Sequence, residues 1–92
     1  MECTNLDEVR CNIDLIDKQI IKLIAERGMY VKQASKFKKD SHDVKAPQRV
    51  EVVIQKVRNL ADEYGANPDL VEKMYRELIS GFINMELEEF NK

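Results

Sequence analysis

Residues 6–38 read LDEVRCNIDLIDKQIIKLIAERGMYVKQASKFK, and the rest of the chain is organised around this segment. Apolar side chains recur along it in alternating steps of three and four residues, the pattern of one long helix with a single packed face, here called the seam. The seam positions are Leu6, Val9, Ile13, Ile16, Ile20, Leu23, Tyr30, Ala34 and Phe37. Arg27 occupies one further position of the same series. Because a charge in an apolar seam is costly unless an anion meets it, Arg27 predicts a bound anion or a buried carboxylate.

The predicted helix is longer than a domain of this size is wide. We expect Thr4 to be its N-cap and the helix to run to about Lys39, which makes it roughly 50 Å long. A compact domain of 92 residues is only about 26 Å across. The helix must therefore project beyond its own subunit, and its seam needs a second chain to cover it. We expect a homodimer.

Two shorter helices are expected after the long one. Residues 40–46 are polar and aperiodic, which predicts a loop. Pro47 is well placed to open a second helix, and Gly65 to close it. Asn67 is well placed to cap a third helix. The sequence thus predicts one all-α domain over residues 1–92, with three helices of which the first is much the longest.

Composition excludes several classes of function. A net charge of −2 argues against a general nucleic-acid binder, and no apolar run approaches the length of a membrane span. No signal peptide is recognisable at the start, so we expect a cytoplasmic protein. Cys3 and Cys11 match no zinc or redox spacing and are expected to be reduced thiols. His42 is the only histidine, which makes a metal site improbable.

Three cations of the long helix are candidates for binding an anion: Arg10, Arg27 and Lys38. Arg27 and Lys38 are three helical turns apart, so they point the same way to within about 20° and lie roughly 16 Å apart along the axis. Arg10 lies about 42 Å from Lys38 by the same rise, and it can share a small ligand with Lys38 only in an antiparallel dimer. Two-fold symmetry would then create two identical sites. The alternative is that each cation pairs with a carboxylate of another helix.

Two residues outside the long helix complete the set of candidates. Arg49 lies near the start of the second helix, where a plain surface arginine is the alternative. Glu86 lies on a mainly apolar face of the third helix, in line with Ile79 and Phe82. A carboxyl group there either pairs with an arginine or stays protonated.

Ser41, His42 and Asp43 contain the residue types of a catalytic triad, but neighbours in one loop do not converge as a triad must.

With these residues in place, the sequence resembles the all-helical chorismate mutase family. The resemblance is carried by VRCNIDLIDKQIIKLIAER at 9–27, KQASKFK at 32–38 and APQRV at 46–50. The spacing of the three cations is its specific part. The resemblance implies an intertwined dimer of three-helix chains with two active sites. It also implies the rearrangement of chorismate to prephenate, a pericyclic reaction that needs no cofactor and no metal.

The resemblance also implies a role for each candidate residue. Arg27, together with Arg10 from the partner chain, is expected to bind the two carboxylates of the substrate. Lys38 is expected beside the ether oxygen, where negative charge builds as the C–O bond breaks. Glu86 is expected to donate a hydrogen bond to the same oxygen, and Arg49 to support the carboxylate end. Because Glu86 can donate only when protonated, we expect more mutase activity at acidic pH.

The sequence departs from the mutase pattern in ways that keep alternatives open. Ala46 and Val50 stand where family mutases often have an acid. The APQRV segment and residues 30–32 look more like the isochorismate pyruvate lyase branch, which makes salicylate and pyruvate on the same fold. That branch typically has Gln where this chain has Glu86. Lyase activity is therefore the main alternative, and a non-catalytic helical dimerisation or ligand-sensing module is the alternative of another class.

Overall fold

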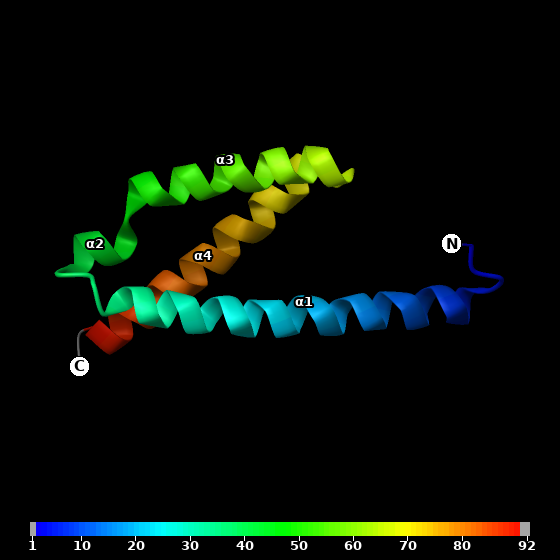
Figure 1. Ribbon diagram of the computed structural model, residues 1–92, viewed down its shortest axis with the longest axis horizontal. Helices are drawn as coiled ribbons and strands as arrows, with labels where there is room; N and C mark the ends of the chain where they lie inside the picture. Colours follow the sequence, from blue (N-terminus) through cyan, green and yellow to red (C-terminus); the bar gives the residue numbers. More distant parts are fainter. Residues whose placement is uncertain (1, 91–92) are drawn as a thin grey trace. The chain divides into compact units, whose positions relative to one another are not determined.

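The computed structural model describes residues 2–90, which form helices and no strands. Three long helices and one short helix follow one another along the chain (Figure 1): α1 (Leu6–Ser35), α2 (Ser41–Lys45), α3 (Pro47–Tyr64) and α4 (Pro68–Phe90). The predicted all-α fold, with the longest helix first, is confirmed. None of the helices in this part of the chain is long and apolar enough to cross a membrane. The chain divides into two compact units, Met1–Gln33 and Ala34–Lys92.

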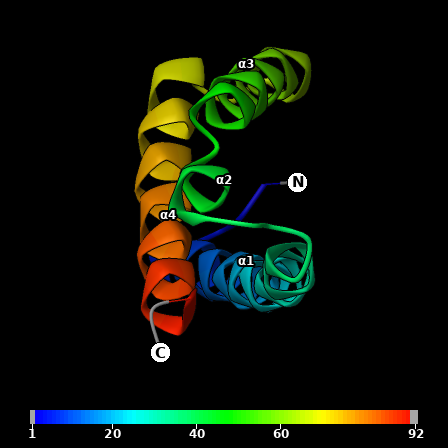
Figure 2. The same ribbon diagram turned by 90° about the vertical axis from the view of Figure 1, so that its left-hand side faces the viewer.

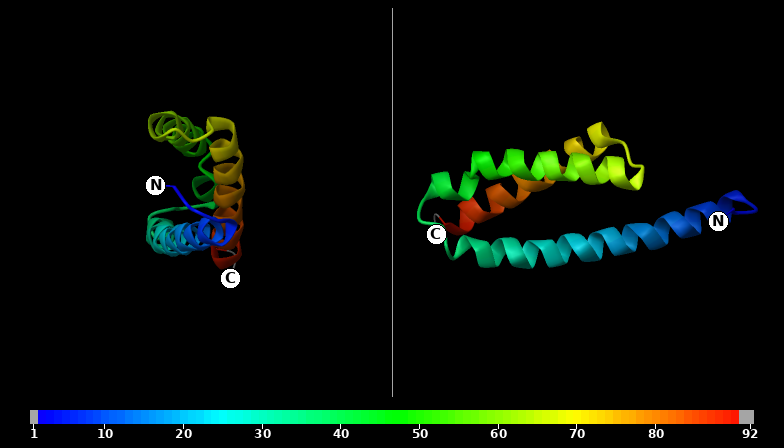
Figure 3. Two further views of the ribbon diagram at one scale, coloured as in Figure 1. Left: turned by 90° about the vertical axis from the view of Figure 1, so that its right-hand side faces the viewer. Right: turned by 45° about the horizontal axis from the view of Figure 1, so that its top comes forward.

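The first unit is essentially α1, a single unbroken helix (Figure 3). Its N-cap is Asn5, whose Oδ1 accepts a hydrogen bond from the backbone N–H of Glu8 at 2.9 Å. The prediction that Thr4 is the N-cap is therefore wrong by one residue, because both residues are good caps and only geometry separates them. Thr4 instead donates to the Glu8 carboxylate through its backbone N–H at 2.8 Å and its hydroxyl at 2.9 Å. Both bonds lower the pKa of Glu8, and the bond from the backbone N–H has the larger effect.

The apolar seam of α1 is exposed in the single chain. No residue of α1 is buried. Along the seam Val9 is 39% exposed, Ile16 54% and Leu23 62%. An exposed apolar stripe of this kind is typical of surfaces that contact another protein.

The end of α1 differs from the prediction. The helix ends at Ser35 and not near Lys39. Beyond it the backbone N–H groups of Phe37 and Lys38 donate to carbonyls three residues back, at 3.0 and 3.2 Å. Such tighter bonds are typical of a helix that is ending. The chain then turns, and Lys38 lies in this turn and not on the helix.

The segment 40–46 also differs, because it contains the one-turn helix α2. The Asp40 side chain accepts a hydrogen bond from the backbone N–H of Asp43 at 2.9 Å and caps this turn. Ala46 closes it with a left-handed backbone, φ 37°, and its N–H donates to the carbonyl of His42 at 2.9 Å. The loop prediction failed because five residues are too few to show an apolar period.

The boundaries of α3 and α4 follow the prediction. α3 begins with Pro47, and Gly65 closes it in the left-handed conformation, φ 76°, which costs glycine nothing. The Asn67 side chain accepts hydrogen bonds from the backbone N–H groups of Asp69 and Leu70, at 2.9 and 3.2 Å, and so caps α4. These three boundaries are confirmed.

The core of the second unit lies where α4 packs against α3 and α2 (Figure 2). Its buried apolar side chains come from all three helices: Val44 of α2, Ile54, Val57 and Ala61 of α3, and Ile79 of α4. This core is small, as expected for a chain of this length.

Candidate active site

Lys38 and Glu86 meet in a partly buried ion pair. The Lys38 Nζ donates to a carboxylate oxygen of Glu86 at 2.9 Å, across 48 residues of chain. The Lys38 side chain is 22% exposed and the Glu86 side chain 9% exposed. A charge-assisted hydrogen bond in such a sheltered place is stronger than one on the open surface. The structure thus brings together the two residues that the resemblance implies as catalytic.

Lys38 makes this contact from the segment that follows the end of α1. Because the helix stops at Ser35, Lys38 is free to turn towards α4, and α2 then follows directly. Val44 of α2 is only 2% exposed and anchors this segment in the core. The predicted continuous helix through Lys38 is wrong, so the 16 Å spacing from Arg27 that assumed it does not apply. Sequence reasoning did not identify Val44 as the anchor because it is a single apolar residue in a polar segment.

Arg49 lies in the first turn of α3, in the same unit as the ion pair. Its side chain is exposed, and it makes no ion pair with any residue between 2 and 90. Its charge is therefore available to an anion from outside the chain.

Ala46, three residues earlier, sets the direction of α3 through its left-handed backbone, which a residue with a side chain adopts only at a cost of about 1 kcal/mol or more.

Arg10 and Arg27 belong to the first unit. Arg10 is exposed on α1, and Arg27 is half-buried. The two lie about 25 Å apart along the axis of α1. A small molecule cannot contact both residues of one chain. A ligand bound by an Arg10 and an Arg27 would therefore contact residues from two copies of the chain.

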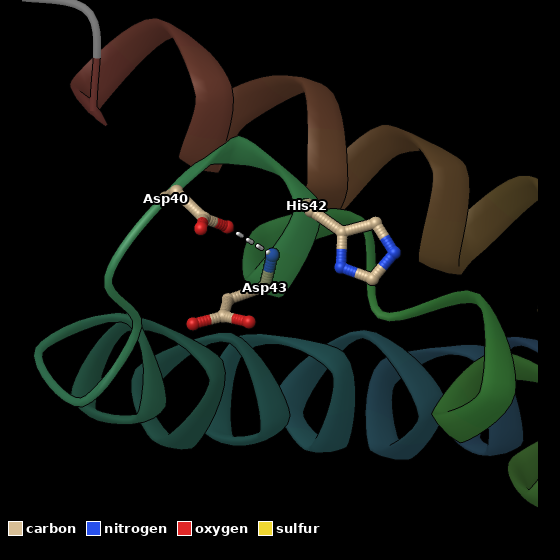
Figure 4. Close-up of side chains that lie close together, drawn as sticks. All are labelled: Asp40, His42 and Asp43. Atoms are coloured by element: carbon tan, nitrogen blue, oxygen red, sulfur yellow. Dashed lines mark hydrogen bonds between the residues drawn. The ribbon is translucent and has the colours of Figure 1, made fainter.

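A second polar cluster lies in α2 and the residue before it (Figure 4). The ligand atoms of Asp40, His42 and Asp43 lie within 4.8 Å of one another. The Asp40 carboxylate accepts from the N–H of Asp43, and the Asp43 carboxylate accepts from the N–H of Lys39 at 3.1 Å. Both carboxylates therefore stabilise the start of α2, and we assign no metal to this exposed cluster.

Comparison with known proteins identifies the family of this chain. The family model described as chorismate mutase type II matches residues 9–87, which include every candidate residue named above. The chain belongs to the chorismate mutase type II family. The family resemblance predicted from Arg10, Arg27, Lys38, Arg49 and Glu86 is confirmed.

Three relatives illustrate the range of this family. An isochorismate pyruvate lyase of Pseudomonas aeruginosa is 34% identical over 82 residues, which is 89% of this chain and 81% of the lyase. A chorismate mutase of Methanocaldococcus jannaschii is 32% identical over 75 residues, which is 80% of this chain and 76% of the mutase. A bifunctional chorismate mutase/prephenate dehydratase of Aquifex aeolicus is 31% identical over 85 residues, 88% of this chain but only 24% of that protein.

Proposed function

We propose that this member of the family is a chorismate mutase, which rearranges chorismate to prephenate in a pocket of fixed cations. The observation that carries the proposal is the 2.9 Å contact between Lys38 and Glu86, two residues with the required chemistry in one sheltered place. A pericyclic reaction needs no nucleophile and no redox group. It needs a surface that matches the charge and shape of the transition state.

Lys38 has the chemistry to stabilise the breaking C–O bond. As that bond lengthens, the ether oxygen gains negative charge, and a fixed cation beside it lowers the barrier. One such preorganised donor is often worth about 3 kcal/mol. The Lys38 ammonium has three N–H donors, of which the contact with Glu86 uses one. The others remain for the ether oxygen of the substrate. Glu86 accepts from Lys38 in the structure, so the donation to the same oxygen that the resemblance implies requires the protonated form of Glu86.

The arginines have the chemistry to hold a dicarboxylate. A guanidinium forms paired hydrogen bonds with a carboxylate, which fix its orientation as well as its position. We assign Arg27, and Arg10 of a second copy, to the two carboxylates of the substrate, and Arg49 to support one of them. Holding the substrate in its reactive conformer removes part of the entropic barrier.

A homodimer is part of this proposal. The exposed seam of α1 supports it, because no residue of that helix is buried in the single chain. Two copies related by two-fold symmetry would form two identical sites, each with one Arg10 from the other chain. Cys3 and Cys11 are free and exposed, which favours a reducing, cytoplasmic location.

The test is to supply the purified protein with chorismate and with isochorismate in separate assays. Mutase activity yields prephenate from chorismate. Formation of salicylate and pyruvate from isochorismate, without prephenate from chorismate, would replace the mutase assignment by lyase activity.

Lyase activity is the second candidate, and two observations favour it. The APQRV segment at residues 46–50 resembles that branch, and the Pseudomonas aeruginosa lyase aligns with most of the chain. The lyase reaction also breaks the ether C–O bond, so Lys38 would have the same role. A protein that binds a dicarboxylate transition-state analogue but turns over neither substrate would instead be a ligand-sensing module.

A further inference from the structure

A continuous network of ion pairs joins α3 to α4, and the proposed reaction makes no direct use of it. The Arg76 guanidinium of α4 donates to both carboxylate oxygens of Glu51 on α3, each at 3.0 Å. The Nε of Arg76 also donates to Glu72 at 2.7 Å. Glu72 accepts from Arg58 of α3 at 2.8 Å, and Arg58 pairs with Asp69 at 3.0 Å.

Arg76 is the centre of this network. Its hydrogen bonds are the largest cause of the lowered pKa of both Glu51 and Glu72. In return, the bond with Glu51, followed by that with Glu72, raises the pKa of Arg76. Single exposed ion pairs contribute little, but bidentate and shared pairs are the exception. We therefore attribute to Arg76 both a measurable contribution to stability and a geometric role.

The network holds a part of α3 that has no fully buried side chain. The first buried residue of α3 is Ile54, and none of the residues from 47 to 53 is buried. In that stretch the bidentate contact between Glu51 and Arg76 is the ion pair that joins α3 to α4. Arg49 lies only two residues before Glu51, in the same stretch.

We propose that Arg76 is a positioning residue of the active site, which acts through Glu51 to place Arg49. Arg76 and Glu86 lie on the same helix, about 15 Å apart along its axis. Arg76 binds both carboxylate oxygens of Glu51. This contact limits both the sliding of the first turns of α3 along α4 and their rotation about it. Because Arg49 precedes Glu51 by two residues in the same turn of α3, the contact sets the position of the backbone from which the Arg49 side chain extends. This inference rests on the proposed function of the site.

The variant Arg76→Met tests this role, with Lys73→Met as the matched control. Lys73 is exposed on the same helix, and its substitution removes the same charge without breaking an ion pair between described residues. We expect Arg76→Met to raise KM about fivefold and to change kcat by less than about twofold, since Arg49 would hold the substrate in both ground and transition states. Arg76→Lys should behave like Arg76→Met, because one ammonium cannot replace the two-pronged contact. Lys73→Met should leave both constants unchanged.

A double-mutant cycle separates positioning from general loosening of the fold. If Arg76 acts through Arg49, Arg76→Met should have no further effect on KM in an Arg49→Met background. An equal effect in both backgrounds, or an unchanged KM in the single variant, would overturn the positioning role alone. A wild-type protein that neither turns over chorismate or isochorismate nor binds a dicarboxylate transition-state analogue would overturn the proposed function, and the positioning role with it.

Discussion

The exposed seam of α1 allows a quantitative test of the homodimer through the variant Ile16→Ala. Ile16 is 54% exposed in the single chain, so about half of its side chain is left for a partner to cover. Complete burial of an isoleucine is worth about 1.5–3 kcal/mol, and the exposed half is therefore worth about 1 kcal/mol. A two-fold dimer contains this side chain twice, which makes the loss about 2 kcal/mol per dimer. At 1.4 kcal/mol per tenfold, the dimer dissociation constant should rise roughly 30-fold.

Leu15→Ala is the matched control for this measurement. Leu15 is 56% exposed, almost the same as its neighbour, but it points about 100° away around the helix and lies off the seam. Analytical ultracentrifugation over a dilution series gives the dissociation constants of the wild type and of both variants. We expect Leu15→Ala to match the wild type. Equal weakening by the two substitutions, or a wild type that is monomeric at every concentration, would refute the role of the seam.

Three further predictions concern the site and its support. Variants Arg10→Ala and Lys38→Ala should each be nearly inactive. When the two are mixed and exchange subunits, half of the dimers contain one intact site, so about a quarter of wild-type activity should return. No recovery would place Arg10 outside the partner's site. Glu86→Gln keeps a hydrogen-bond donor at this position and should retain mutase activity, whereas Glu86→Leu, which can neither donate nor accept, should lose most of it; equal activity of the two variants would remove Glu86 from hydrogen bonding to the substrate. The carboxylates that Arg76 holds have lowered pKa values, so their contribution to stability is present above the unfolded pKa of about 4 and is lost as pH falls through the folded values. The difference in free energy of unfolding between the wild type and Arg76→Met, from urea denaturation, should therefore be present at neutral pH and close in acid, whereas a constant difference would contradict the ion-pair role.

Much of the fold could be predicted because it depends on local chemistry. The seam of α1 is a periodic pattern over some thirty residues, which random sequence rarely imitates. Pro47, Gly65 and Asn67 each have a backbone preference that matches one kind of helix end, and each lies at the predicted end. Thr4 and Asn5 have nearly the same preference, so the prediction there missed by one residue.

The contacts that shape the site could not be predicted in the same way. The pair of Lys38 with Glu86 joins residues 48 positions apart, and no local pattern encodes that approach. The network around Arg76 was not predicted from the sequence. Its one local signal is the pair Glu72 and Arg76, four residues apart on α4. Its link to Glu51 requires the register of α3 against α4, which only the packed structure supplies.

The early end of α1 has a functional meaning within the proposed mechanism. On a helix that continued to Lys39, Lys38 would remain in line with Arg27, with its backbone held about 16 Å further along the same axis. Because the helix ends at Ser35, the backbone of Lys38 enters a turn, and its ammonium reaches the carboxylate of Glu86 on α4. The cap formed by Asp40 and the burial of Val44 hold that turn in place. Within the proposed mechanism, the turn after Ser35 is therefore part of the active site, because it holds the lysine that we assign to the breaking bond of the substrate.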